Sequence, residues 1–190
     1  MGFLSNEELL NLGFNKLGNN VLISKKASLY NTKNISIGSN VRIDDFSIIS
    51  AGEEGIEIGD YVHIACFVSF IGKAKIVLED YVGISSKTSV YSSSDDYTGN
   101  FMTNPTISDE FKNVDNRPVV FKKYSIIGAG SIILPGVIIG EGTAVGALSL
   151  VTKILPEWSV YMGSPVRFIK QRKKEMLRFL PQLEKLLYEK

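Results

Sequence analysis

The chain contains one histidine, His63, and one cysteine, Cys66, among its 190 residues. Imidazole exchanges protons near neutral pH, so His63 is a candidate general base. The adjacent carboxylates Asp95 and Asp96 are further candidates for proton transfer. Each candidate has an alternative without chemistry: His63 at the surface or at a subunit interface, and the carboxylates as caps of a loop turn. Cys66 is interpreted as a packing residue, because a lone cysteine offers neither a disulfide nor a metal cluster.

Large apolar residues recur every six positions through much of the chain, both before and after these candidate residues. Six is neither the helical period nor the alternation of a half-buried strand, and it is typical of a hexapeptide β-helix. The apolar sets are Ile37, Ile43 and Ile49; Ile58, Ile64 and Phe70; Leu78, Ile84 and Val90; and Phe121, Ile127, Ile133, Ile139, Val145 and Val151. In the last of these sets, which starts at Phe121, a small or β-branched residue stands four positions after each of the first five members. These residues are Ser125, Ser131, Val137, Thr143 and Ser149.

The period predicts an all-β fold, a left-handed parallel β-helix in which three short strands make one triangular coil. The large residue of each hexad points into the prism and the small residue fits beside a corner, while each coil hydrogen-bonds to its neighbours. We expect a helical cap over residues 1–20, the β-helix over 21–166 with an extruded loop over 94–119, and a C-terminal helix over 167–190.

Both ends of the chain read as helical. Ser5 is placed to cap a short helix that ends near Gly13 and covers the first coil, since solenoids need end caps. The run from Phe168 onwards has a helical pattern, which Pro181 is expected to interrupt.

Between Val90 and Phe121 the period is lost, and the segment is long, polar and rich in turn residues. A loop of this length within a repeat fold is usually functional or disordered, and its aromatic and acidic residues favour a binding loop. The side chains expected to contact a bound molecule are Asp96, Tyr97, Phe101 and Asn104.

The bulk composition excludes several classes of protein. The net charge of +1 gives no electrostatic footprint for nucleic acid. No stretch is apolar over the ~20 residues that a membrane helix needs, and the first residues lack a signal-peptide pattern. A cytoplasmic protein without membrane insertion is therefore the expectation.

The hexads, the loop, the run Val151-Thr152-Lys153 and the ending from Gly163 to Ile169 resemble the hexapeptide-repeat acyltransferases. The likeness spans roughly residues 20–173 and is nearest to bacterial sugar O-acetyltransferases of the galactoside, maltose and surface-polysaccharide kind. It implies a homotrimer in which acetyl-CoA and a sugar or nucleotide-sugar acceptor meet between neighbouring prisms, without a metal. Transfer to a hydroxyl, in surface-polysaccharide biosynthesis, is the first expectation. N-acetylation of an amino sugar or antibiotic is the alternative, as is a non-catalytic binding or assembly module.

The resemblance assigns six positions to coenzyme A. Two small residues would line the groove for the pantetheine arm, a Thr-Lys pair follows the last hexad, and two cations would face the phosphates. Small residues at tight corners and solvated cations are the alternative interpretation. In this order the positions are Ala129 and Ala147, Thr152 and Lys153, and Arg167 and Lys170.

This chain departs from the family in its loop. Many members place a catalytic histidine at a position that falls within residues 93–95, where no histidine occurs. Either His63 is the base from another position, or Asp95 serves, or catalysis is impaired. A zinc enzyme of the carbonic-anhydrase kind is disfavoured, because such sites use about three histidines.

The phase of the repeat favours His63. If Phe121 restarts on the first face of the prism, His63, Gly83, Ile126 and Gly146 are expected to share one corner, with Ala129 and Ala147 just past it. At ~4.8 Å per coil, His63 and Gly146 would lie roughly 15 Å apart, within reach of a pantetheine arm.

The residues between these positions are expected to complete the site. Gly83 and Ser85 would leave room for the coenzyme, and the Gly83 amide is a candidate donor to the oxyanion. Asp95 would lie at a different corner and reach the site from a neighbouring subunit.

Overall fold

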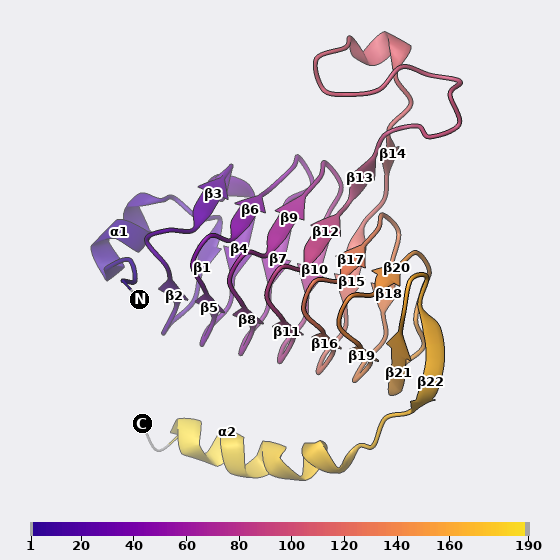
Figure 1. Cartoon of the computed structure of the whole chain (residues 1–190). Helices are drawn as coiled ribbons and strands as arrows, with labels where there is room; N and C mark the ends of the chain where they lie inside the picture. Colours follow the sequence, from indigo (N-terminus) through magenta and orange to yellow (C-terminus); the bar gives the residue numbers. More distant parts are fainter. Residues whose placement is uncertain (1, 189–190) are drawn as a thin grey trace.

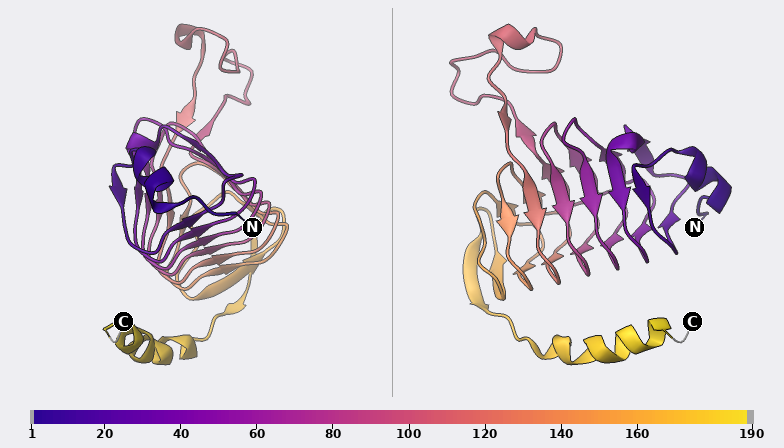
Figure 2. Two further views of the ribbon diagram at one scale, coloured as in Figure 1. Left: turned by 90° about the vertical axis from the view of Figure 1, so that its left-hand side faces the viewer. Right: turned by 180° about the vertical axis from the view of Figure 1, so that it is seen from behind.

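The protein, represented by a computed structural model that describes residues 2–188, is a stack of triangular coils (Figure 1). Three sheets form the sides of the prism, and neighbouring coils pair in parallel. A view along the stack shows the coils superimposed on one another (Figure 2, left). The predicted parallel β-helix is confirmed.

The strands of each sheet follow one another from the N-terminal coil onwards. Sheet one contains β1 (Lys16–Leu17), β4 (Ile35–Ile37), β7 (Ile56–Ile58), β10 (Ile76–Leu78), β15 (Val119–Phe121) and β18 (Ile138–Ile139). Sheet two contains β2 (Leu22–Ile23), β5 (Arg42–Ile43), β8 (His63–Ile64), β11 (Gly83–Ile84), β16 (Ile126–Ile127), β19 (Ala144–Val145), β21 (Ser159–Met162) and β22 (Arg167–Gln171). Sheet three contains β3 (Ser28–Tyr30), β6 (Ile48–Ser50), β9 (Ser69–Ile71), β12 (Ser89–Tyr91), β17 (Ile132–Ile133) and β20 (Leu150–Val151).

The apolar residue of each hexad fills the prism, as predicted. All the members of the four apolar sets are buried, and Phe70 and Phe121 are the largest side chains that are completely enclosed. The small residues beside them bind the corners: Ser131 and Ser149 each donate a hydroxyl hydrogen bond of 2.7 Å, to the carbonyls of Gly128 and Gly146. Burial of one continuous apolar column therefore holds the coils in register.

An aromatic ladder stiffens the corner that leads from sheet one into sheet two. Tyr61, Tyr81 and Tyr124 occupy this corner in three successive coils, and Trp158 occupies it two coils further on, past Gly142. Each of the four has a positive φ that L residues rarely adopt. The ring centroids of the first three are 5.0 and 5.2 Å apart, and the last pair is 6.4 Å apart. Stacking offsets part of the backbone strain and fixes the point at which each strand of sheet two begins.

The N-terminal cap has the predicted form. Helix α1 (Asn6–Asn11) begins with a capping box, in which the Glu8 amide donates to Ser5 Oγ at 3.2 Å and the Ser5 amide donates to Glu8 Oε2 at 2.6 Å. Leu9 of this helix is buried against the first coil.

The C-terminal end differs from the expected helix over 167–190. Its first part, β22, is a strand antiparallel to β21, because residues 167–171 add a hydrogen-bonded edge to the last coil. A 3₁₀ turn over Glu175–Phe179 leads into α2 (Leu180–Tyr188). Pro181 stands in the first turn of α2 and does not interrupt it, since a proline there loses no helical hydrogen bond. Within residues 2–188 no helix is long and apolar enough to cross a membrane.

The loop leaves the prism on a stalk. Strands β13 (Ser93–Ser94) and β14 (Asp115–Asn116) pair in antiparallel fashion, and a 3₁₀ turn over Asp109–Phe111 lies near the tip. All three views show the loop projecting from the side of the prism opposite the strands of sheet two (Figures 1 and 2).

A further 3₁₀ turn, Thr32–Asn34, lies outside the loop and precedes β4.

We expect replacement of Phe70 by alanine to destabilise the protein by about 3–5 kcal/mol, because the ring is completely buried and a cavity would remain. Urea unfolding followed by circular dichroism measures this loss. A loss below about 1 kcal/mol would mean that the interior collapses around the gap.

Candidate active site

His63 lies on the outer surface of sheet two, at the start of β8. It pairs with Gly83, which pairs in turn with Ile126, and Ile126 pairs with Ala144. Phe121 pairs with Leu78 on sheet one, so the expected phase after the loop is confirmed. The placement of Gly146 in the row of paired residues that starts at His63 is wrong. Ile126 pairs with Ala144, 18 residues further along the chain, whereas His63 and Gly83 are 20 residues apart.

The alanines expected beside His63 lie at the other end of sheet two. Ala129 and Ala147 stand in the turns that follow β16 and β19, whereas His63 begins β8. In their column the preceding coils hold Cys66 and Ser86, whose Sγ and Oγ atoms are 3.3 Å apart. The expected common edge is therefore wrong. A bound pantetheine arm at the alanines would be separated from the His63 column by about 10 Å, the length of three strand residues.

A shallow pocket of about 240 Å³ lies between these two columns, with His63, Ala65, Gly83, Ser85 and Ile126 around it. Gly83 leaves it open, since an added Cβ would meet only Ile126 Cγ1, at 3.8 Å. The φ angle of Gly83 is not positive, so the backbone does not require glycine there. A larger residue at position 83 would therefore fit the coil, but its side chain would fill the pocket.

The backbone amides of Gly83 and Ser85 are already hydrogen-bonded to the next coil. The Gly83 amide donates to the Ser125 carbonyl at 3.1 Å, and the Ser85 amide donates to the Ile127 carbonyl at 3.0 Å. The expectation that the Gly83 amide serves as an oxyanion donor is therefore wrong. The Ser85 hydroxyl has no hydrogen-bond partner within residues 2–188, so it remains available to a bound molecule.

The structure adds Asp44 to the candidate residues. Asp44 Oδ2 lies 2.9 Å from His63 Nε2, and Asp44 Oδ1 accepts a hydrogen bond of 2.7 Å from Arg42 Nε. Burial raises the pKa of Asp44, but the hydrogen bonds from His63 and Arg42 more than offset this and hold the pKa below its ordinary value. Asp44 precedes His63 by one coil, and strand register was the signal that could have found it.

The six positions assigned to the coenzyme fall in two groups. Arg167 and Lys170 are exposed on β22, which borders the same end of the prism as the turn of Ala147. Thr152 and Lys153 follow β20 of sheet three, at a different corner from Ala147. A single chain therefore does not bring all six positions together along one edge.

The loop candidates lie far from His63 in the same chain. Asp95 directly follows β13, and its carboxylate accepts the amide hydrogen of Asn104 at 3.3 Å. Asp96 accepts backbone hydrogen bonds from four residues between 98 and 101, so it organises the loop turn. Tyr97 is 92% exposed and Phe101 is about half exposed. Because the loop projects away from sheet two, these side chains and His63 do not share a site within one chain (Figure 1).

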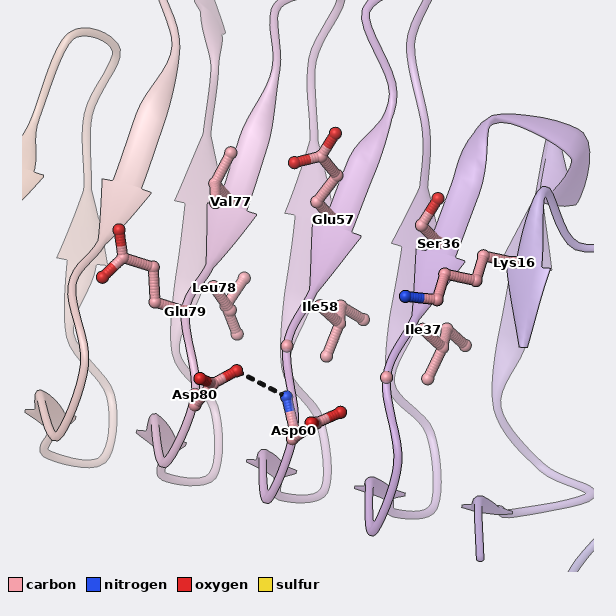
Figure 3. Close-up of a pocket in the computed structure, with 12 residues that line it drawn as sticks. Lys16, Ser36, Ile37, Glu57, Ile58, Asp60, Val77, Leu78, Glu79 and Asp80 are labelled. Carbon is pink, nitrogen blue, oxygen red and sulfur yellow. Dashed lines mark hydrogen bonds between the residues drawn. The ribbon is translucent and has the colours of Figure 1, made fainter. Parts of the chain in front are cut away.

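A larger hollow of about 460 Å³ lies over sheet one and has a structural explanation (Figure 3). The Asp60 amide donates to Asp80 Oδ1 at 2.9 Å, so the carboxylate caps a corner amide of the preceding coil. Glu57 and Glu79 are paired with lysines at 2.6 and 2.7 Å. The charges around this hollow hold neighbouring coils together.

Comparison with known proteins identifies the family. A scan against models of known families finds no match. The dTDP-4-amino-4,6-dideoxy-D-glucose acyltransferase of Escherichia coli is 49% identical over 93% of this chain and 92% of its own length. The chain belongs to the hexapeptide-repeat acyltransferases.

Solved structures agree with this assignment. AntD, an N-acyltransferase from Bacillus cereus in complex with dTDP and 3-hydroxybutyryl-CoA, is 49% identical, with a TM-score of 0.93 over 98% of both chains. Other AntD structures carry a substitution of one serine or one aspartate and contain coenzyme A. A maltose O-acetyltransferase from Clostridium difficile, 23% identical with a TM-score of 0.58 over 88% of this chain and 75% of its own, shares the fold. The expectations of acyl transfer and of a coenzyme A thioester as donor are confirmed for the family.

Filling the pocket at Gly83 should inactivate the acyltransferase without unfolding it. We expect Gly83→Val to lower kcat/KM by ~tenfold or more, because the side chain would displace a bound substrate from its reacting position. The temperature of thermal unfolding should not fall, since an added Cβ would meet only Ile126 Cγ1, at 3.8 Å. Gly128→Val is the matched control: its Cβ would come within 2.4 Å of the Ala147 backbone nitrogen, so this variant should lose stability. Full activity of Gly83→Val would exclude this pocket as the active site.

Proposed function

We propose that this acyltransferase transfers an acyl group from a coenzyme A thioester to the 4-amino group of a dTDP-4-amino-4,6-dideoxy hexose. The observation that carries the proposal is the likeness to AntD, which has been solved with dTDP-4-amino-4,6-dideoxyglucose and coenzyme A together. This relative favours an amine acceptor over the hydroxyl that was the first expectation. The donor is acetyl-CoA or a longer thioester such as 3-hydroxybutyryl-CoA, with which AntD has also been solved.

The proposed active unit is a homotrimer with each site between two prisms. Support comes from the geometry of one chain, in which the loop and sheet two face opposite directions (Figure 2). The pocket of one subunit would supply His63 and Ser85, and the loop of its neighbour would supply Asp95. Tyr97, Phe101 and Asn104 of that loop would contact the acceptor, while Asp96 keeps the loop in shape.

The proposed reaction uses His63 as base and Ser85 as donor. The sugar amine attacks the thioester carbonyl as His63 takes one of its protons, and the Ser85 hydroxyl donates to the oxyanion. The carbon–sulfur bond then breaks, and His63 returns the proton to the departing sulfur. The products are an amide and free coenzyme A, so no further reactant is needed. A serine and an aspartate are the residue types substituted in the AntD variants, and Ser85 and Asp95 provide both types here.

The coenzyme would lie along the turns of Ala129 and Ala147, with its phosphates toward the C-terminal coil. Arg167 and Lys170 on β22 would then meet the phosphates. Thr152 and Lys153, at the other corner, would meet a coenzyme bound mainly to a neighbouring subunit. Because acyl-CoA and nucleotide sugars are both cytosolic metabolites, we place the reaction in the cytoplasm, in the biosynthesis of a surface polysaccharide.

Thiol release measured with each acyl-CoA tests the proposed function. We expect release with dTDP-4-amino-4,6-dideoxyglucose and none with dTDP-6-deoxyglucose, which carries a hydroxyl in place of the amine. Release with the hydroxyl compound alone would show an O-acyltransferase. No release and no binding of either nucleotide sugar would show that the proposal is wrong.

Removal of the base or of the donor should reduce turnover while coenzyme affinity is retained. We expect His63→Ala to lower kcat by about 10²–10⁴-fold and Ser85→Ala by about 10²–10³-fold. Asp95→Asn should cost less or act mainly on the KM for the acceptor. Ser89→Ala is the control, because that hydroxyl lies on sheet three and bonds Ser69 at 3.1 Å. Near-normal kcat in His63→Ala together with an inactive Asp95→Asn would reverse the two roles.

Mixed oligomers test whether the site is shared. A chain that lacks residues 95–104 retains His63, and a His63→Ala chain retains the loop. Each should be inactive alone, while coexpression should restore roughly a quarter of the sites, because one interface in four would join the two intact halves. Sedimentation equilibrium should show trimers throughout. A stable monomer, or no recovery in the mixture, would contradict the shared site.

A further inference from the structure

We infer that Asp44 is a positioning residue for His63, which holds the imidazole by Nε2 and leaves Nδ1 as the atom that accepts the substrate proton. The inference rests on the proposed function for its kinetic consequences. Its structural basis is the 2.9 Å contact between Asp44 Oδ2 and His63 Nε2, from one coil to the next.

The surroundings of Asp44 show that it is a fixed anchor. Its side chain is 9% exposed, whereas that of His63 is 53% exposed at the pocket. Its other oxygen, Oδ1, accepts from Arg42 Nε at 2.7 Å. Both acceptor oxygens are therefore held by strand residues of sheet two, and a nearly buried carboxylate supports a side chain that reaches the surface.

The contact fixes the roles of the two ring nitrogens. A carboxylate without a proton only accepts hydrogen bonds, so Nε2 must carry the hydrogen. In the neutral ring the lone pair then belongs to Nδ1, the atom able to take a proton from the attacking amine. Once Nδ1 has taken the proton, the ring is a cation beside the Asp44 carboxylate, and the proton then passes to the departing sulfur. Arg42 balances the charge of Asp44 while the ring is neutral.

The pocket is consistent with this assignment. Around the ring, Gly83 of the next coil adds no side chain, while Ala65 and Ser85 add only small uncharged groups. The charged partners of the ring and of its anchor that the structure gives within residues 2–188 are Asp44 and Arg42. The His63 ring thus contacts Asp44 of the preceding coil on one side and borders the pocket on the other.

A double-mutant cycle tests whether Asp44 acts through His63. We expect Asp44→Ala to lower kcat by roughly 10–100-fold with little change in the KM for acyl-CoA, a smaller loss than from His63→Ala. In the His63→Ala background the same substitution should cost nothing more, because the group it positions is gone. Asp45→Ala is the matched control, since that carboxylate bonds Ser24 and pairs with Lys26, away from His63. An equal loss from Asp44→Ala in both backgrounds would overturn the inference.

A measurement without substrate keeps this test independent of the proposed function. His63 is the only histidine, so histidine labelled with ¹⁵N gives one pair of ring signals. We expect a hydrogen-bonded Nε2–H signal in the wild-type protein, and its loss in Asp44→Ala. Asp44→Asn, which keeps the volume, serves if the alanine variant does not fold. A signal from a protonated Nδ1, or a spectrum unchanged by both substitutions, would overturn the inference even if the enzyme's acceptor proves to be a different molecule.

Discussion

The ladder of backbone hydrogen bonds between coils is the interaction on which the rest of the structure depends. The amide of His63 donates to the carbonyl of Val82 at 3.1 Å, and that of Gly83 donates to the carbonyl of Ser125 at the same distance. Along the strands of sheet two the ladder leaves few amides for a ligand. Chemistry on this surface must therefore come from side chains that point outward. In the pocket, the Ser85 hydroxyl and the His63 ring are such groups, so the proposed donor is a side chain and not the amide that the sequence suggested.

The backbone hydrogen bonds between coils also explain how much of the structure could be predicted from the sequence. Pairing between coils places equivalent residues of successive coils side by side, so the period of the apolar side chains reports the pairing. The burial of the hexad residues and the return of Phe121 to sheet one were therefore predictable. The column of His63 was predicted only as far as Ile126. Beyond the loop, Ile126 and Ala144 are 18 residues apart, whereas in the earlier coils Arg42 and His63 are 21 apart and His63 and Gly83 are 20 apart, so counting by 20 gave Gly146 in place of Ala144. This change is visible in the sequence, because the apolar residues from Phe121 to Val151 continue in steps of six without the gaps that separate the earlier sets.

Other parts of the site depend on interactions that a period does not encode. In the sequence Asp44 follows the inward-facing Ile43 and resembles an ordinary surface charge. In the structure its side chain is nearly buried and contacts both His63 and Arg42. The loop is shaped by the β13–β14 stalk and by backbone hydrogen bonds to Asp96 within its turn, and neither feature repeats along the chain. The strand β22 was taken for helix because its sequence, RFIKQ, lacks the alternation of a half-buried strand and continues into the apolar and basic residues of the C-terminal helix.

The glycines of sheet two show how the structure separates a fold requirement from a functional one. Gly128 and Gly146 lie under a neighbouring coil, and an added Cβ would come within 2.4 Å of the Ala147 nitrogen or 2.8 Å of Met162 Cβ. Close packing of the coils therefore accounts for both. Gly83 has open space and an ordinary backbone conformation, so packing does not account for it. A strand position gains stability from a β-branched side chain, and a glycine there weakens the strand. Glycine at this position leaves open the space between His63 and Ile126, and the proposed active site would use that space.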